Sequence, residues 1–241
     1  MMLMHEAIPG LVDQDVSAVQ GGGASVSEIE RRLAPYVARA EPRQQAMASR
    51  QGLLSPAERT NSGPVAEVSG DATPDACQHR RRRARWDPEA GRDELRREVV
   101  QPLGAPEAVL VLDDTGLLNT GRHAAGVARP YRGTAGTVDH GHMGVLLGAA
   151  SALGHALVDR ERDLPEAWTD TRERCQHAGI PADRPLATTP PLGRQLLARA
   201  LAAGVPARWV TGDRVSGHDR RLRMGLEAQP PAYVLAVSGQ V

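Results

Sequence analysis

Beyond residue 104 the hydrophobic positions of the chain fall into short runs that glycine-rich turns separate. Runs of this length, rich in Val, Leu and Ala and bounded by turn residues, predict β-strands. Between and after these runs the spacing of apolar residues becomes helical, and the alternation predicts a mixed α/β sheet covered by helices. We expect strands at 108–112, 124–128, 143–150, 154–158, 208–211 and 232–237, and helices at about 166–178, 190–203 and 218–228.

The pattern before residue 104 is different, because its apolar residues recur at helical spacing and prolines fall where the first turns of helices would be. Ser25 or Ser27 would cap the first of these helices, and Pro74 and Pro88 would begin later ones. Residues 1–27 end in a Gly/Ser stretch typical of a flexible leader. We therefore expect three parts: a leader at 1–27, a helical domain at 28–104 and an α/β domain at 105–241.

Two adjacent acids follow the first predicted strand, in the stretch VLVLDDTG at 109–116. Asp113 and Asp114 would lie at the carboxyl end of a buried strand, where open α/β sheets bind their ligands. The alternative for this stretch alone is a simple turn cap, since Asp-Thr-Gly is also favourable turn chemistry.

A second strand end repeats the arrangement, in ARWVTGD at 207–213, and supports the functional interpretation. Asp213 would leave this strand as Asp113 and Asp114 leave the first. Magnesium ions favour carboxylate oxygens together with substrate phosphates, and phosphodiester chemistry with two metal ions uses shared carboxylates. The sequence therefore predicts a site for Mg²⁺ or Mn²⁺ at Asp113, Asp114 and Asp213.

Composition excludes several other classes of protein. The 29 basic and 29 acidic residues balance, so no overall basic field indicates a nucleic-acid or membrane partner. The two cysteines have no metal-ligand spacing and are expected to be reduced. The amino-terminal apolar stretch has neither the basic start of a signal peptide nor the length of a membrane span. We expect a cytoplasmic protein without a membrane partner.

One strongly basic run, HRRRRARW at 79–86, is a candidate DNA contact. Its arginines would neutralise phosphates without reading the sequence of bases. The alternative is a solvated helix face balanced by the acids that follow. The candidate nucleic-acid-binding residues are Arg80, Arg81, Arg82, Arg83 and Arg85.

Histidines near residue 140 offer a competing metal site. In VDHGHMG, His140 and His142 would point to one face of a strand, and a transition-metal site could include neighbouring acids. The glycines of this stretch, Gly141 and Gly144, favour a turn instead, and no third ligand has recognisable spacing. The other residues considered for this site are Asp139, His155 and Asp159.

Five blocks taken together in this order resemble the DDE-superfamily endonucleases that act as transposases of bacterial insertion sequences. The blocks are VLVLDDTG, HAAGVARPYRGTAG, GHALVDRERDLPEAWTDTRERCQHAGIP, RALAAGVPARWVTGD and YVLAV. The resemblance covers about residues 29–241. It implies an RNase H-like mixed sheet flanked by helices and preceded by a small all-α amino-terminal domain. It also implies DNA as substrate, divalent metal ions, a possible homo-oligomer, and catalytic aspartates at the Asp113/Asp114 pair and at Asp213.

The resemblance fails in one respect that bears on activity. The family's catalytic glutamate lies on a helix well downstream of the second aspartate, and no position in this chain corresponds to it; Asp219 and Glu227 are too near to replace it. Lysines usual after the family's DDTG are also replaced, by Asn119 and Thr120. These departures predict a truncated or decayed copy that binds metal without cleaving DNA. Two alternatives stay open: a DNA-binding or interaction remnant without chemistry, and an unrelated metal-dependent hydrolase that uses the histidines.

Overall fold

The computed structural model divides the chain into two compact units, Met1–Leu95 and Arg96–Val241, and each is described by itself. The division falls inside helix α5, Pro88–Leu103. The described residues are 27–54, 62–68, 70, 73, 75, 86–118, 126, 128–132, 138–165, 168, 171–180, 188–228 and 230–238.

The described part of unit 1 is helical, as the sequence predicts. Residues 27–33 form a helix that runs into a 3-10 turn, η1 (Ala34–Tyr36), and two further helices, α2 (Ala40–Leu54) and α3 (Ser62–Val68), pack against each other. Helix α5 then begins at Pro88, where a proline suits the first turn because its missing N–H has no helical partner there.

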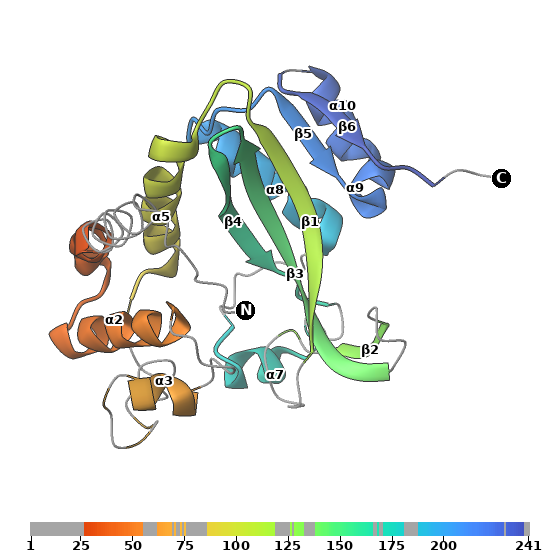
Figure 1. Ribbon diagram of the computed structural model, residues 1–241. Helices are drawn as coiled ribbons and strands as arrows, with labels where there is room; N and C mark the ends of the chain where they lie inside the picture. The colour runs from red at the N-terminus through yellow and green to blue at the C-terminus, as the bar shows by residue number, and fades with distance from the viewer. Residues whose placement is uncertain are drawn as a thin grey trace, which may run out of the picture. The chain divides into compact units, whose positions relative to one another are not determined.

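Unit 2 contains a six-stranded mixed sheet, which confirms the predicted fold class (Figure 1). The long strand β3 (Val138–Ser151) pairs antiparallel with β1 (Val109–Leu118) on one side, and with β2 (Ala128–Arg132) and β4 (Gly154–Arg162) on the other. On its second edge β1 runs parallel to β5 (Trp209–Gly212), which in turn runs parallel to β6 (Ala232–Leu235).

The hydrophobic core lies on one face of this sheet, under helices α8 (Thr189–Ala202), α9 (Arg214–His218) and α10 (Arg220–Ala228). Leu110 and Leu112 of β1 point into it, and helix α8 approaches β1 so closely that a Cβ on Gly193 would come 2.7 Å from Cδ2 of Leu112. Leu222 and Leu226 of α10 complete the same cluster beside β5. Leu112 of β1 and Gly212, the last residue of β5, are thereby fixed side by side.

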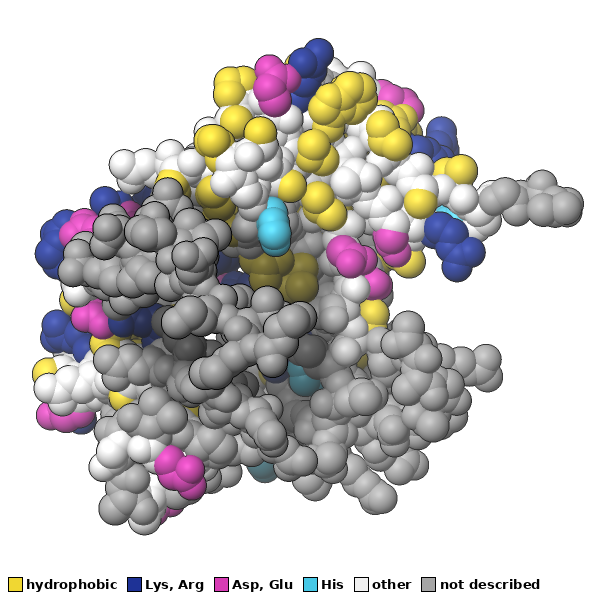
Figure 2. All heavy atoms as spheres, viewed as in Figure 1, with side chains coloured by type: hydrophobic (Ala, Val, Ile, Leu, Met, Phe, Trp, Pro, Cys, Tyr) yellow, Lys and Arg dark blue, Asp and Glu magenta, His cyan; other side chains and the backbone are white. Residues whose placement is uncertain are grey.

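The opposite face of the sheet carries exposed apolar side chains. Because side chains alternate along a strand, the residues between the buried ones point away from α8. Val111 of β1 is 36% exposed and Trp209 of β5 is 39% exposed, while Leu157 of β4 and Val234 of β6 are 63% and 64% exposed. Figure 2 shows hydrophobic side chains gathered over unit 2 on the face turned to the viewer.

Several element boundaries differ from the predicted ones. Strand β4 continues to Arg162 rather than ending at 158, and β3 begins at Val138, so Gly141 and Gly144 lie inside a strand and the turn expected there is wrong. Strand β2 begins at Ala128, where the predicted run 124–128 ends. The short helices α7 (Arg172–His177) and α9 complete the order of elements. Among the described residues, no helix combines the length and apolarity needed to cross a bilayer.

Candidate metal centre at the ends of two parallel strands

The parallel pairing of β1 with β5 brings the predicted acids together. The pairing of the two strands runs from Val109 opposite Trp209 to Leu112 opposite Gly212, so Asp113 and Asp213 each follow the last residue paired between β1 and β5. The prediction that the first strand ends at 112 is wrong, because β1 continues through Asp113 and Asp114 to Leu118, paired with β3. Carboxylate oxygens of Asp113, Asp114 and Asp213 all lie within 4.8 Å of one another. We call these three residues the acidic cluster.

Adjacent residues of a strand normally point to opposite faces, yet Asp113 and Asp114 both reach Asp213. The reason is that β5 leaves the sheet after Gly212, so in the described part of the chain no strand pairs with the edge of β1 beyond Leu112 on that side. Asp114 extends from the core-facing side of β1, while Asp113 lies on the exposed side. The cluster thus occupies an open corner of the sheet.

Local hydrogen bonds hold two of the three carboxylates. The side chain of Asp213 caps helix α9, where its Oδ1 accepts a hydrogen bond of 3.0 Å from the Ser216 N–H. Oδ1 of Asp113 accepts a hydrogen bond of 2.9 Å from the Asp114 N–H. Gly212 permits the tight exit from β5, because a Cβ there would lie 2.9 Å from Cβ of Ser216. Each of these two carboxylates keeps a second oxygen for a ligand.

In the acidic cluster, the pKa of Asp114 is shifted. Burial raises the pKa of its carboxyl group above the ordinary value, and the negative charges of Asp213 and Asp113 raise it further. Like charges at this distance disfavour simultaneous ionisation unless a cation compensates them. Among the described basic residues, none forms an ion pair with a member of the acidic cluster.

A fourth carboxylate, Asp163, lies close enough for its charge to interact with that of Asp114. Burial raises the pKa of Asp163 and the charge of Asp114 raises it further. Its Oδ1 is buried and has no hydrogen-bond partner in the described part of the chain. Sequence reasoning missed Asp163 because the strand before it was expected to end at 158, while β4 in fact delivers this acid to the same end of the sheet.

These carboxylates suit a hard divalent cation. Mg²⁺ and Mn²⁺ take oxygen ligands, and Mg²⁺ is commonly held by one or two carboxylates with waters and substrate phosphates completing its shell. The acidic cluster offers three carboxylates without described cationic partners. The buried oxygen of Asp163, which has no described hydrogen-bond partner, is a further possible metal ligand nearby. The residues present therefore fit such an ion.

The histidine alternative finds less support in the described residues. His142 pairs with Leu117 while His155 pairs opposite Ala150, eight residues further along β3, which is about 27 Å at the rise of a strand. Asp159 is held by arginines instead. Burial, followed by the charge of Arg162, lowers the pKa of His142, whose Nδ1 is buried without a described partner. The side chains of Asp139 and His140 lie outside the described residues.

The two acids considered as replacements for a downstream glutamate have other partners. Asp219 pairs with Arg194, and its Oδ1 accepts a hydrogen bond from the Arg221 N–H. Glu227 accepts a hydrogen bond of 2.8 Å from the Tyr233 hydroxyl. Neither belongs to the acidic cluster. The candidate DNA-binding arginines, Arg80 to Arg83 and Arg85, lie outside the described residues.

Comparison with known proteins agrees with this geometry. A family model described as DDE superfamily endonuclease matches residues 32–241. The match covers most of the chain, including β1, β5 and the whole acidic cluster. The mixed sheet with flanking helices is consistent with the RNase H-like fold of such enzymes. A comparison with curated protein sequences gives no match.

Proposed function

Because the chain belongs to the DDE superfamily of endonucleases, we propose that it is a transposase that cleaves DNA strands at the ends of an insertion sequence and joins them to target DNA. The observation that carries this proposal is the convergence of Asp113, Asp114 and Asp213 within 4.8 Å where the parallel pairing of β1 with β5 ends. Carboxylates so placed can hold Mg²⁺ or Mn²⁺ against a phosphodiester.

Divalent metal ions in such a site activate the attacking oxygen and stabilise the leaving oxygen of an in-line displacement. The protein's own part is positioning. Asp213 is fixed at the start of helix α9 and Asp113 by the backbone of its neighbour, so both present a free oxygen in a defined direction. Asp114 and Asp213 are both partly buried. Burial raises the pKa of Asp114 and the charges of Asp213 and Asp113 raise it further; a bound cation would compensate the part that is due to repulsion.

A second metal ion would need carboxylate oxygens beyond those of the acidic cluster, and Asp163 is a described acid near enough for its charge to interact with that of Asp114. Its buried oxygen lacks a partner and its charge already interacts with that of Asp114. We assign Asp163 a supporting role at this metal centre.

The test is a nicking assay on supercoiled plasmid DNA with Mg²⁺ or Mn²⁺. Nicking should require metal and should be lost in Asp114→Asn and Asp213→Asn, and Asp163→Asn should lower it strongly. Glu107→Gln is the matched control, because Glu107 is an exposed acid that precedes β1 and pairs with Arg208 far from the cluster. The departures from the family pattern predict the opposite result, in which the wild-type chain binds metal without any nicking. That result would contradict the catalytic proposal and favour a DNA-binding protein without chemistry.

A further inference from the structure

Helices α9 and α10 carry three exposed arginines next to the metal centre. Arg214 is the first residue of α9 and follows Asp213 directly, so their Cα atoms are about 3.8 Å apart. Arg220 and Arg221 begin α10 and are exposed as well. None of the three forms an ion pair with an acid in the described part of the chain. We call Arg214, Arg220 and Arg221 the α9–α10 arginines.

The acids of the same segment do not neutralise these arginines. Asp219, between the two helices, pairs with Arg194 and caps the first turn of α10. Glu227 lies at the other end of α10, where it accepts a hydrogen bond from the Tyr233 hydroxyl. Asp213 belongs to the acidic cluster, whose charge a bound metal ion would compensate. Because the chain has no net charge, the α9–α10 arginines form a local positive surface that attracts anions.

The backbone that carries Arg214 is held in place from both ends of α9. The Asp213 side chain caps the start of the helix. Near its end, α9 packs so closely on the residues after β6 that a Cβ on Gly217 would overlap the Ala236 carbonyl oxygen. The Arg223 guanidinium donates a hydrogen bond to the Gly217 carbonyl and so ties α10 to α9. Arg214 therefore starts from a backbone position that is fixed relative to Asp213.

The metal centre indicates which anion would reach this surface. A phosphodiester held by a metal ion at Asp213 belongs to a strand whose phosphates follow one another at about 3.4 Å of helix axis. Arg214 is bonded to Asp213, so its side chain starts next to the position of that phosphodiester. A guanidinium presents its donors in a planar fork that matches phosphate oxygens. The neighbouring phosphates of the same strand therefore suit the α9–α10 arginines.

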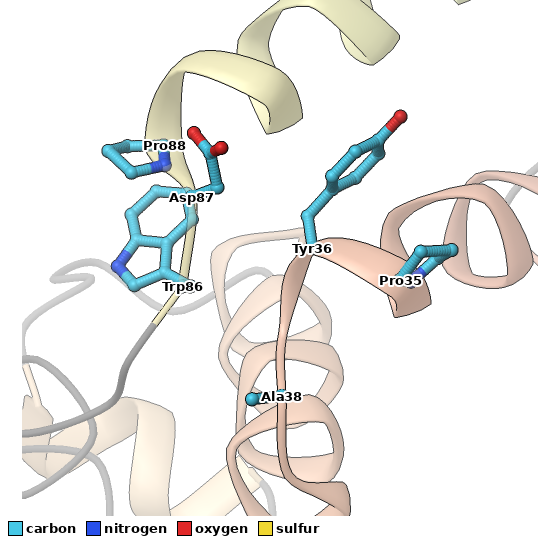
Figure 3. A pocket seen from close by; sticks show the side chains of 6 residues that line it. All are labelled: Pro35, Tyr36, Ala38, Trp86, Asp87 and Pro88. Atoms are coloured by element: carbon cyan, nitrogen blue, oxygen red, sulfur yellow. The ribbon is translucent and has the colours of Figure 1, made fainter.

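Unit 1 contains an open hollow whose lining has a different character. Figure 3 shows the rings of Trp86 and Tyr36 on opposite sides of an open space. The described lining includes the acid Asp87 and no basic side chain, so it does not suit a phosphate. The lining residues are Pro35, Tyr36, Ala38, Trp86, Asp87 and Pro88.

We propose that the α9–α10 arginines bind the DNA strand that enters the metal centre. Arg214 contacts the phosphate next to the scissile one, and Arg220 and Arg221 contact phosphates further along the strand. The inference rests on the proposed function in taking DNA as the ligand. An acidic protein segment is the competing partner, because it would meet the same positive charges. The adjacent metal centre favours DNA, since carboxylates that hold a metal ion bind a phosphodiester and repel an acidic peptide.

The salt dependence of DNA binding tests this proposal without catalysis. Fluorescence anisotropy of a labelled duplex in chelator gives the association constant at several salt concentrations. Each phosphate contact contributes about 0.9 to the slope of its logarithm against the logarithm of salt concentration. Arg214→Gln should make the slope shallower by about 0.9, and joint replacement of the three arginines by about 2.7. Arg214→Lys should keep the slope of the wild type, because the charge is retained.

Arg208→Gln is the matched control. Arg208 is an exposed arginine that precedes β5, at the end of the strand opposite to Asp213, and it pairs with Glu107. This variant should leave the slope unchanged. Thermal unfolding of the Arg214→Gln and triple variants should match that of the wild type, because the replaced side chains are exposed and form no ion pair with a described acid.

An unchanged slope in the triple variant would overturn the proposal, as would an equal loss in Arg208→Gln. Binding of polyglutamate that requires the α9–α10 arginines, with DNA binding independent of them, would assign the surface to an acidic protein segment instead. The measurements need no metal ion and no turnover. A slope that depends on the arginines, in a protein that does not nick plasmid DNA, would therefore contradict the catalytic proposal alone.

Discussion

Two groups of acids lie on the same sheet of unit 2, and their surroundings are opposite. The side chain of Asp159 in β4 is fully buried and accepts hydrogen bonds of 2.7 and 2.8 Å from the Arg199 guanidinium. The Arg96 guanidinium also lies 3.5 Å from Oδ2 of Asp159. Glu161, two residues along, accepts one of 3.1 Å from Arg199. We call Asp159 and Glu161 the arginine-paired acids. The acidic cluster, where the pairing of β1 with β5 ends, forms no ion pair with a described basic residue.

The difference in charged partners distinguishes acids that stabilise the fold from acids that are able to bind a cation. Burial alone lowers the pKa of Arg199, but its hydrogen bonds and charge interactions with Asp159 and Glu161 outweigh this and raise it. In the acidic cluster burial raises the pKa of Asp114, and the charges of Asp213 and Asp113 raise it further. A buried charge is tolerated when a partner compensates it, so the arginine-paired acids are complete within the protein while the acidic cluster needs a cation from solution.

We expect the largest effect on stability from removing a charge of the arginine-paired acids. Asp159→Asn leaves the guanidinium of Arg199 and the nearly buried Arg96 without their shared carboxylate. We expect the free energy of unfolding to fall by roughly 3–5 kcal/mol, as when one member of a buried ion pair is removed. Urea denaturation measures this, with Glu107→Gln as an exposed ion-pair control that should change stability by less than about 1 kcal/mol. A loss no larger than that of the control would remove the distinction between the two groups.

Removing one arginine should cost less than removing the shared acid. In Arg199→Gln, Asp159 keeps its contact with Arg96, so only part of the compensation is lost. We expect a decrease of about 2 kcal/mol in the free energy of unfolding, because a glutamine amide replaces some of the hydrogen bonds. Urea denaturation of Asp159→Asn and Arg199→Gln in parallel shows which variant loses more stability. A larger loss of stability in Arg199→Gln would show that Arg96 contributes little to the compensation of Asp159.

In the acidic cluster, by contrast, removing one negative charge should stabilise the metal-free protein. The folded-state pKa of Asp114 is raised, so its contribution to stability is present below the ordinary pKa of 3.8 and is lost as pH rises through the folded value. At neutral pH Asp114→Asn should therefore raise the free energy of unfolding, by no more than about 1 kcal/mol because water screens this half-buried group. The gain should disappear in acid unfolding series below pH 3.8. Destabilisation at neutral pH in chelator would contradict the account.

The smallest effect concerns the coupling of Asp163 to Asp114. Because the charge of Asp114 raises the pKa of Asp163, removing that charge in Asp114→Asn should lower it. Burial, the larger cause, stays in place, so the shift should be only partial. Carbon-detected NMR titration of the side-chain carboxyl groups measures it. An unchanged Asp163 titration would separate this residue from the metal centre.

The acidic cluster could be predicted from the sequence because it depends on two strands, and runs of hydrophobic residues reveal both of them. Strands at 108–112 and 208–211 were expected from their apolar residues, and acids that leave parallel neighbouring strands meet at one edge of the sheet. Asp213 could also have indicated helix α9, since Asp is a favoured N-cap residue. Which strands are neighbours, by contrast, depends on long-range pairing that local patterns do not report.

The second half of β4 could not be recognised in the same way. Asp159 and Glu161 look like solvated charges in the run VDRER, so the strand was expected to end at 158. They are inward-facing residues whose burial depends on Arg199 of α8, forty residues away in the sequence. Asp163 was overlooked for the same reason, because it ends a strand whose true length only the tertiary ion pairs explain.

The central claim is that the acidic cluster holds a divalent cation, and thermal unfolding with Mn²⁺ tests it most directly. The wild type should gain about 2.7 kcal/mol at a metal concentration one hundred times the dissociation constant, and its melting temperature should rise. Asp213→Asn is the decisive variant, since asparagine also caps helices and keeps α9 intact while the charge is lost. We expect the Mn²⁺ effect to vanish in Asp213→Asn and in Asp114→Asn, and to persist in Asp159→Asn on a lower baseline. Equal Mn²⁺ stabilisation of the wild type and Asp213→Asn, or none in the wild type, would contradict the account.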